Sequence, residues 1–346
     1  MDGRKILTVG VAYRPVRGGI ASVESVYSTF YNPFNHIATA PAGSSSKVRK
    51  LFQFGSALFQ FLWWMLFHPE IQIVHVHVAS QASFWWKRII INLAKAFRKI
   101  VVFHLHGGLF QEFYAHHQQV VQDTIDKCDC VITLSDYWRH WVETTFDCPK
   151  VVTINNVIES PKLNKVPHGM FTLLFLGLLA EDKGIYDLLD VIARHKTEFA
   201  GRLQLLIGGN GDAERVKNFI AQHGLIDIIK FAGWVSGEKK SQLFNTADAF
   251  ILPSYHEGVP ISILEAESYA LPVISTQVGG IPEIVTGNGI LFKPGDKNAM
   301  YQAIVRMMTD EKLCATMGVK SLAVAKPHLP DSVERQLAAL YAQWLA

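Results

Sequence analysis

The sequence has few charged residues for its length of 346 residues. Charged residues make up 18% of the chain and hydrophobic residues 49%, which excludes an intrinsically disordered protein, because such chains combine low hydrophobicity with high net charge. No collagen, heptad or short repeat is present, so a fibrous protein is excluded too. At about 100–200 residues per domain, the length predicts two domains.

The first residues lack the long apolar run and the small-residue cleavage site of a signal peptide. The chain passes from Met1–Lys5 directly into the apolar residues Ile6–Val9. We therefore expect a cytoplasmic protein whose first strand lies close to its N-terminus.

Cysteines are also few, and the sequence contains only Cys128, Cys130, Cys148 and Cys314. A zinc site would need a second ligand pair at the usual spacing, and none is present. Cys128 and Cys130 are two residues apart on a predicted strand, so their side chains are expected to point to the same face. We interpret them as buried free thiols.

Net charge differs between the two halves of the chain. Residues 1–165 hold 17 Lys/Arg and 11 Asp/Glu, which gives 17 − 11 = +6, whereas residues 166–346 hold 16 and 19, which gives 16 − 19 = −3. A mildly basic first half favours an anionic partner, either a phosphorylated ligand or an anionic membrane surface. A nucleic-acid-binding protein would be more basic and its charges more clustered, so no nucleic-acid partner is expected.

Short β-branched runs alternate with helical stretches in both halves. Strands are predicted at Ile6–Val11, Ile71–His77, Ile100–His104, Cys130–Leu134, Lys150–Ile154, Thr172–Leu176, Leu203–Ile207, Ile229–Phe231, Ala249–Leu252, Pro272–Ser275 and Gly289–Phe292. The helices predicted with them are Ile20–Phe30, Phe84–Phe97, Gln118–Asp126, Gly184–Arg194, Ala213–His223, Lys239–Ala247, Ile261–Ala270, Ile281–Thr286, Asn298–Thr309 and Asp331–Leu345. Strands separated by helices indicate parallel sheets covered on both faces.

The stretch 158–170 has two prolines and no apolar period, so it is interpreted as a linker. The predicted fold is therefore α/β, with two doubly wound, Rossmann-like parallel-sheet domains that face a cleft. The first domain would cover residues 1–160 and the second residues 161–328, with a C-terminal helix at 329–346 that packs back on the first. Ligands of such domains bind beyond the carboxyl ends of the strands.

The most informative segment follows the predicted strand Ala249–Leu252. A loop with Glu257 and Gly258 leads to a helix predicted to start at Pro260, where a missing N–H costs nothing. The free N–H groups and the dipole of the helix start form an anion site, and Gly258 lets the backbone approach a ligand closely. Glu257 and Glu265 can edge one pocket, where carboxylates accept hydrogen bonds from sugar hydroxyls. The pattern favours a diphosphate with a sugar at one end and a ribose at the other.

Other polar residues have simpler interpretations. Glu267 is expected to be an exposed residue that the helix dipole favours. His75 and His77 alternate on one strand, where a metal pair is conceivable, but a packed strand end is preferred. His116 and His117 are expected on a solvated helix or loop. No Asp-x-Asp occurs, so a metal-clamped nucleotide site has no candidate and no metal is expected.

The two glutamates lie in the frame Ser-x-x-Glu-Gly-x-Pro-x-x-x-x-Glu-Ala, followed by Pro-Val-Ile-x-Thr and Gly-Gly-Ile-Pro-Glu-Ile-Val. This frame resembles the E-x7-E signature of retaining glycosyltransferases of family 4, which have the GT-B fold. Further resemblances cover nearly the whole chain and are more specific in its second half. They lie at Gly18–Ile20, Ile73–His77, His104–Gly108, Phe175–Gly177, Asp182–Gly184, Ile207–Gly211 and Phe231–Val235.

The resemblance implies an activity and a site. Enzymes of this family move a sugar from a nucleotide diphosphate, here UDP- or GDP-linked, to a hydroxyl group with retention of configuration and without a metal or other cofactor. By resemblance, the catalytic residues are Glu257, which would hold the transferred sugar, and His106, which would face the sugar and the acceptor. The donor-binding residues are Lys183 on a phosphate oxygen, Glu265 on the ribose, the backbone of Gly258, Val259 and Ile261 on the diphosphate, Gly19 in the first loop, and Gly177 and Val235 in two loops of the second domain.

One departure from the family concerns the donor site. The family usually has Gly-Arg where this chain has Gly177-Leu178, so one cationic phosphate ligand is missing. A catalytically weak sugar-nucleotide-binding subunit, and an epimerase or phosphorylase of the same fold, therefore stay open. An NAD-dependent dehydrogenase is disfavoured, because neither Gly10–Gly19 nor Gly208–Gly211 has the G-x-G-x-x-G spacing.

An aromatic-rich stretch, Leu51–Phe67, follows Lys47, Arg49 and Lys50. Basic residues before an aromatic helix resemble an interfacial membrane anchor, to which Trp85–Arg88 could add. A core helix packed on the first sheet is the alternative, and one helix could do both. We expect an enzyme at the inner face of the cytoplasmic membrane, with a lipid-linked acceptor, in surface polysaccharide or glycolipid biosynthesis.

Overall fold

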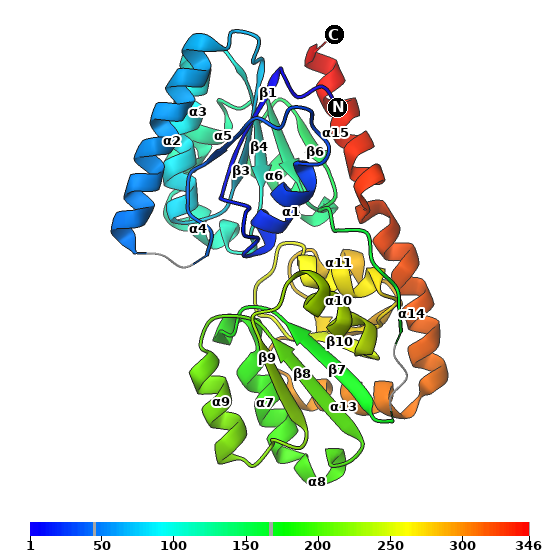
Figure 1. The fold of residues 1–346 in the computed structure, drawn as a ribbon. Coiled ribbons are helices and arrows are strands. Elements are labelled where there is room, and N and C mark those ends of the chain that lie inside the picture. The colour runs from blue at the N-terminus through cyan, green and yellow to red at the C-terminus, as the bar shows by residue number, and fades with distance from the viewer. Residues whose placement is uncertain (44–45, 166–168, 346) are drawn as a thin grey trace. The chain divides into compact units, whose positions relative to one another are not determined.

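The computed structural model describes residues 1–43, 46–165 and 169–345. Part of the predicted linker 158–170 and the last residue of the predicted helix 329–346 lie outside the described residues. The chain forms two compact units, Met1–Ile158 with His328–Ala346, and Glu159–Pro327. Figure 1 shows both units, each built around its own sheet.

The first unit is built on a six-stranded parallel sheet with the strand order β2-β1-β3-β4-β5-β6. Its strands are β1 (Ile6–Gly10), β2 (His36–Ala38), β3 (Ile73–Val78), β4 (Ile100–Leu105), β5 (Cys130–Thr133) and β6 (Val151–Thr153). Strands β1 and β3 are buried along their whole length, as expected for parallel strands that are covered on both faces.

Helices cover both faces of this sheet. They are α1 (Gly19–Tyr27), α2 (Lys47–Phe67), α3 (Ala82–Ala96), α4 (Phe110–His116), α5 (Gln118–Ile125), α6 (Asp136–Thr145) and α15 (Pro330–Leu345). Alternation along β3 divides its residues between the faces. Val74 and Val76 share a core cluster with α2 and α3, whereas His75 contacts Tyr27 of α1 and Tyr341 of α15.

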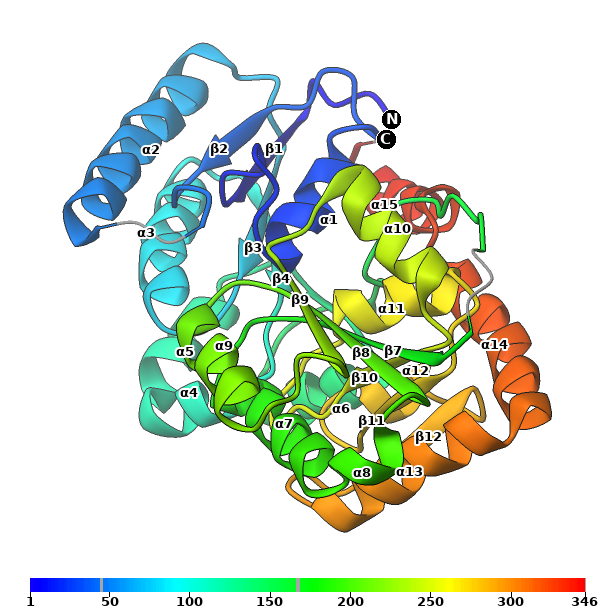
Figure 2. The same ribbon diagram turned by 60° about the horizontal axis from the view of Figure 1, so that its bottom comes forward.

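The second unit repeats this architecture with the strand order β12-β11-β10-β7-β8-β9. Its strands are β7 (Phe171–Leu176), β8 (Leu203–Gly208), β9 (Ile229–Gly233), β10 (Ala249–Leu252), β11 (Val273–Thr276) and β12 (Gly289–Phe292). Figure 2 shows several helices of this unit along the sheet. The helices are η1 (Glu181–Lys183), α7 (Ile185–Arg194), α8 (Lys196–Phe199), α9 (Ala213–Gln222), α10 (Gly237–Thr246), α11 (Ile261–Ser268), α12 (Ile281–Ile284), α13 (Lys297–Thr309) and α14 (Glu311–Ala325). A short helix, η2 (Lys326–His328), follows α14. The predicted α/β class with two parallel sheets is confirmed.

Some elements differ from the prediction. Strand β2 and helices α4, α6, α8 and α14 were not expected. Helix α14 buries Gly318, Ser321 and Ala325, so its inner face is made of small residues and has no apolar period. A Cβ at Gly318 would lie 2.4 Å from the carbonyl oxygen of Ala270, which shows how closely α14 packs.

The cysteines are free, and Cys128 and Cys130 are buried. Burial raises the pKa of the Cys130 thiol to about 12. The prediction that both lie on one strand is wrong, because β5 begins at Cys130 and Cys128 lies in the segment before it. Among the described residues, no helix has the length and hydrophobicity needed to cross a membrane.

Candidate functional site

Four loops meet at the carboxyl ends of the strands in the second unit. They follow β7, β8, β10 and β11, and backbone hydrogen bonds join them in pairs. The bonds run from Leu179 N to Asn210 O (2.6 Å), from Tyr255 N to Asp182 O (2.8 Å) and from Gly280 N to Gly258 O (2.8 Å). The sheet therefore brings together segments that lie up to a hundred residues apart in the sequence, as expected at this edge of a parallel sheet.

Two glycines allow the close approach of these loops. Gly184 has φ +67°, and a Cβ there would lie 2.1 Å from the carbonyl oxygen of Pro253. Gly279 has φ +54°, and a Cβ there would lie 2.0 Å from the carbonyl oxygen of Glu257. Both positions require glycine, because the conformation and the contact each exclude a side chain. The loop that carries Glu257 is thereby packed against the loop after β7 at Pro253 and against the loop after β11 at Glu257.

The Glu257 carboxylate accepts two hydrogen bonds inside this loop cluster. Lys183 Nζ donates to Oε1 at 2.8 Å, and the Ser254 hydroxyl donates to the same oxygen at 2.8 Å. Lys183 Nζ also donates to the carbonyl oxygen of His256 at 3.2 Å. The side chains of Glu257 and Lys183 are 12% and 21% exposed. The carboxylate is therefore fixed in position while a part of it stays open to a ligand.

Helix α11 begins next to this carboxylate. Pro260 precedes the helix with φ −71° and ψ 123°, so the helix starts at Ile261, as the predicted range Ile261–Ala270 has it, and Pro260 is the residue before the helix instead of its first residue. The Pro260 carbonyl accepts from Ile263 N at 3.2 Å and from Leu264 N at 3.3 Å. Helix geometry gives the N–H groups of Ile261 and Ser262, which come before these two, no acceptor within the helix. Val259 is buried and Ile261 is half-buried beside this turn.

Glu265 has a different lysine partner. Lys240 Nζ of α10 donates to Glu265 Oε1 at 2.5 Å. Burial lowers the pKa of Lys240, but the charge of Glu265 and their hydrogen bond outweigh it, so the pKa is raised. The pair lines a pocket of about 140 Å³ together with Glu159, Ser160, Lys162, Gly237, Glu238, Ser241, Phe244, Ser268 and Tyr269. Glu257 is not among the residues that line this pocket.

The prediction that Glu267 is exposed is wrong. Its side chain is fully buried, and Asn288 Nδ2 donates to Oε1 at 2.9 Å. Burial raises the pKa of this carboxyl well above its usual range. Helix α11 is enclosed on nearly all sides, since every residue from Ile263 to Ser268 is buried. Glu267 is therefore not an exposed, charged residue that interacts with the helix dipole.

The remaining residues of the second unit lie on the neighbouring loops. Gly177 N donates to Gly208 O at 3.1 Å directly after β7. Leu178, which stands where the family has arginine, is 45% exposed. Val235 is half-buried between β9 and α10, and a Cβ at Gly208 would lie 3.1 Å from its side chain. Gly177, Leu178 and Val235 therefore belong to the loops at this edge of the sheet.

The other two predicted residues, His106 and Gly19, belong to the first unit. Gly19 is the first residue of α1 and is exposed. His106 follows β4 directly and is 5% exposed. Its Nε2 lies 2.8 Å from Nδ1 of His77. Burial, with smaller contributions from His75 and Lys87, lowers the pKa of His106 to about 3, so the ring is neutral at physiological pH.

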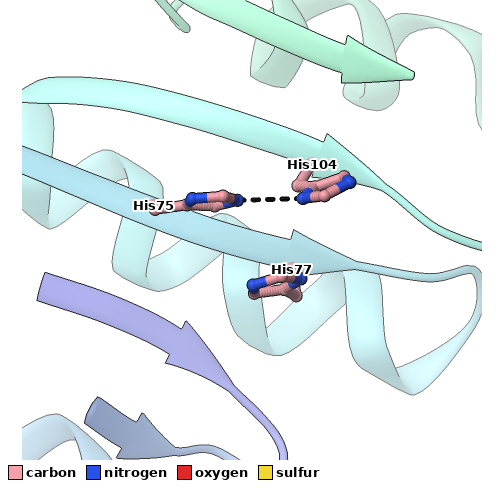
Figure 3. A group of neighbouring side chains, drawn as sticks. All are labelled: His75, His77 and His104. Carbon is pink, nitrogen blue, oxygen red and sulfur yellow. Dashed lines mark hydrogen bonds between the residues drawn. The ribbon is translucent and has the colours of Figure 1, made fainter. Parts of the chain in front are cut away.

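A histidine cluster, defined as His75, His77, His104 and His106, lies on one face of β3 and at the end of β4. His75 Nε2 lies 3.0 Å from His104 Nδ1, and Figure 3 shows these two rings pointing toward each other. The rings of His75 and His77 stack at 4.6 Å between centroids. These residues are buried, as a packed strand end requires.

Three residues of this cluster could also hold a metal ion. Candidate ligand atoms of His75, His77 and His104 lie within 4.8 Å of one another. Tetrahedral zinc with bonds of 2.0–2.1 Å would need nitrogens about 3.3 Å apart. The stacked rings would have to rotate to meet that geometry, so a packed cluster describes them better.

Sequence reasoning did not identify three partners of the predicted residues. Lys240 and Ser254 bind the two glutamates, and the Tyr341 hydroxyl binds His75 Nδ1. Ser254 lies inside the quoted frame, so the frame could have suggested it. Lys240 and Tyr341 come from distant helices, and no motif marks them.

Comparisons with known proteins agree with this arrangement. Residues 170–310 match the family model described as Glycosyl transferases group 1. The amylovoran biosynthesis glycosyltransferase AmsK of Erwinia amylovora is 27% identical over 260 residues, which cover 71% of this chain and 63% of AmsK. The chain spans between 56% and 63% of the length of such curated relatives.

Solved structures share the fold of the whole chain. Sucrose-phosphate synthase from Thermosynechococcus elongatus matches with a TM-score of 0.81 and 18% identity, over 98% of each chain. Anabaena HepE in complex with UDP matches with a TM-score of 0.75 and 17% identity, over 98% of this chain and 100% of HepE. The fold of the chain is therefore that of GT-B glycosyltransferases, and residues 170–310 form a Glycosyl transferases group 1 domain.

Proposed function

We propose that the chain is a retaining, metal-independent glycosyltransferase of family 4, which moves a sugar from a UDP- or GDP-linked donor to a hydroxyl of a lipid-linked saccharide. The observation that carries this proposal is the position of Glu257. Its carboxylate is held by Lys183 and Ser254 at the carboxyl ends of the strands, inside the domain that matches Glycosyl transferases group 1. A fixed carboxylate beside a helix start suits a sugar attached to a diphosphate.

The donor would be bound along this edge of the sheet. Glu265 would accept hydrogen bonds from the ribose hydroxyls in the pocket that it shares with Lys240. The backbone N–H groups of Gly258, Val259 and Ile261 would bind the diphosphate. Lys183 would supply the positive charge that Leu178 cannot. The complex of HepE with UDP supports a uridine nucleotide in a chain of this fold.

Transfer would depend on position and electrostatics. The acceptor hydroxyl would attack the face of the sugar from which the diphosphate leaves, and a donor phosphate oxygen would take its proton. The chain would hold the leaving diphosphate and orient the sugar. Preorganised N–H groups and cations would stabilise the negative charge that develops on the diphosphate, and this lowers the activation barrier of transfer. Glu257 would orient the transferred sugar, and His106 would face the sugar and the acceptor as a neutral imidazole.

The acceptor class rests on one of the relatives and on the composition of the first unit. AmsK acts in the biosynthesis of amylovoran, as its name states, which supports a role in surface polysaccharide or glycolipid assembly. The net charge of +6 over residues 1–165 suits an anionic membrane surface, so we propose a lipid-linked acceptor and a peripheral position at the inner face of the cytoplasmic membrane.

The proposal is tested by donor turnover. A panel of UDP- and GDP-sugars is screened by thermal shift, since a bound donor stabilises the folded state. The stabilising donor is then assayed for release of the nucleoside diphosphate to water or to an acceptor. Glu257→Gln should lower turnover about a thousandfold, the loss typical for one preorganised polar group, while the exposed Glu214→Gln should leave it unchanged. Near-normal turnover in Glu257→Gln would refute the role of this residue.

One alternative is favoured by a specific observation. Leu178 is 45% exposed at the position where the family has a cation, which suits a subunit that binds a sugar nucleotide without transferring it. Thermal stabilisation by a nucleotide sugar with neither hydrolysis nor transfer would establish that alternative.

A further inference from the structure

Helix α2 exposes an unusual number of large apolar side chains. Eight of its residues, with exposures from 38% to 78%, are Val48, Leu51, Phe52, Phe59, Leu62, Trp63, Leu66 and Phe67. Most of them are separated by three, four or seven residues, so they form one stripe along the helix. We call this set the outer stripe of α2.

The outer stripe is not needed to attach α2 to its own unit. The opposite side of the helix buries Phe54, Ala57, Phe61 and Met65 in the core. A helix of a globular protein normally pairs such an apolar side with a polar one. A contiguous exposed apolar patch of this kind marks an interaction surface.

Helix α3 extends the same surface. It packs beside α2, where the rings of Phe54 and Trp86 stack at 5.2 Å, and Figure 1 shows the two helices side by side in the first unit. Trp85 and Ile89 of α3 are 38% and 41% exposed. Tryptophan is enriched where a protein meets the headgroup region of a bilayer, because one edge of its ring is polar.

The charges around the stripe identify the partner. Lys47, Arg49 and Lys50 are exposed at the start of α2, and its 21 residues include no acidic side chain. Cations next to an aromatic and aliphatic stripe complement an anionic lipid surface, which attracts the charges and accepts the apolar side chains between its headgroups. A dimer in which two copies pack through α2 would place no acidic residue of one α2 opposite the basic residues of the other.

We propose that the outer stripe of α2, together with Trp85 and Ile89, is the surface by which this chain docks on an anionic lipid bilayer. The helix lies in the plane of the headgroups with Phe52 and Phe59, the two most exposed side chains of the stripe, inserted deepest. This deepens the proposed function, on which it rests for the lipid-linked acceptor, but the binding itself needs neither donor nor acceptor.

Vesicle sedimentation tests the proposal on the full chain. Binding is measured at low salt to vesicles of phosphatidylglycerol and phosphatidylcholine in equal parts, and to vesicles of phosphatidylcholine alone. The wild type should bind the anionic vesicles and lose affinity as salt is added. The double variant F52Q/F59Q should bind about a hundredfold more weakly, because two exposed phenylalanines lose their apolar transfer energy.

Two further variants separate the contributions. K47Q/R49Q/K50Q should lose about fivefold in affinity per charge on anionic vesicles only, as expected for basic residues near such a surface. The matched control I226Q/V319Q replaces two side chains of the second unit that are 75% and 70% exposed, and it should bind like the wild type. Thermal stabilisation by a nucleotide sugar should persist in F52Q/F59Q, which separates a failure of docking from a failure of the proposed function.

Several outcomes would overturn the proposal. One is a folded wild type that stays in the supernatant with anionic vesicles at low salt. A second is equal binding by F52Q/F59Q and the wild type. A third is a wild-type dimer in light scattering that F52Q/F59Q converts to a monomer without any vesicle binding, because the stripe would then be covered by a second copy.

Discussion

The two units share one architecture, a six-stranded parallel sheet between helices, but they keep their candidate functional groups in opposite environments. In the first unit the histidine cluster is buried, and burial lowers the pKa of His75 and of His106 to about 3. In the second unit the candidate groups are charged and paired. Glu257 with Lys183 and Glu265 with Lys240 have side chains that are 12–25% exposed.

This difference separates what each set of groups can do. Neutral imidazoles that hydrogen-bond to one another inside a core contribute to stability and cannot ionise without a large penalty. Partly exposed ion pairs contribute little to stability. Either charged group of such a pair can bind a ligand in place of its present partner. The first unit is therefore expected to respond to acid, and the second to the donor.

The largest expected effect is the acid response of the first unit. Below pH 6.5 an unfolded histidine takes up a proton, while folded His75 and His106 stay neutral down to about pH 3, so stability is lost as the pH falls from 6.5. At pH 5 the loss is about 2 kcal/mol for each such histidine. Denaturant unfolding followed by tryptophan fluorescence at pH 8 and pH 5 measures it, because seven of the eight tryptophans belong to the first unit.

A pair of variants assigns the acid response to the cluster. His75→Gln should remove about 2 kcal/mol of the difference in the free energy of unfolding between pH 8 and pH 5. The exposed His140→Gln should leave that difference unchanged. Equal unfolding midpoints at both pH values in the wild type would contradict the claim that the buried histidine cluster makes the first unit sensitive to acid.

A smaller effect of opposite sign is expected at Glu267 in the second unit. Burial raises its pKa well above the usual range, so above about pH 4.5 the unfolded carboxyl loses its proton while the folded one keeps it. Stability therefore falls as the pH rises. Glu267→Gln keeps an acceptor for Asn288 and should reduce the loss of stability between pH 5 and pH 8.

Hydrogen exchange of the α11 and α14 amides measures this effect within the second unit. The exposed Glu214→Gln serves as the control and should exchange like the wild type at each pH. Identical pH dependence in the wild type and in Glu267→Gln would show that Glu267 is ionised in the folded state.

Much of the fold could be predicted from the sequence, and less of the site. The strands are marked by short apolar runs, so β10 and β12 were predicted to the residue. Strand β2 has three residues, and α14 packs through small side chains, so neither shows a pattern. Local spacing placed Glu257 beside a helix start. It could not show that α14 encloses Glu267, or that Lys183 and Lys240 approach the two glutamates from 74 and 25 residues away.

The central claim is that the charged loops of the second unit bind the nucleotide part of the donor. Isothermal titration of the wild type with UDP and with GDP tests it most directly, beside Lys183→Met, Glu265→Gln and His75→Gln. One nucleotide should bind, and Lys183→Met and Glu265→Gln should each weaken its affinity about tenfold, the loss expected for one charge-assisted hydrogen bond. His75→Gln should bind like the wild type. Unchanged affinity in both Lys183→Met and Glu265→Gln would contradict the account.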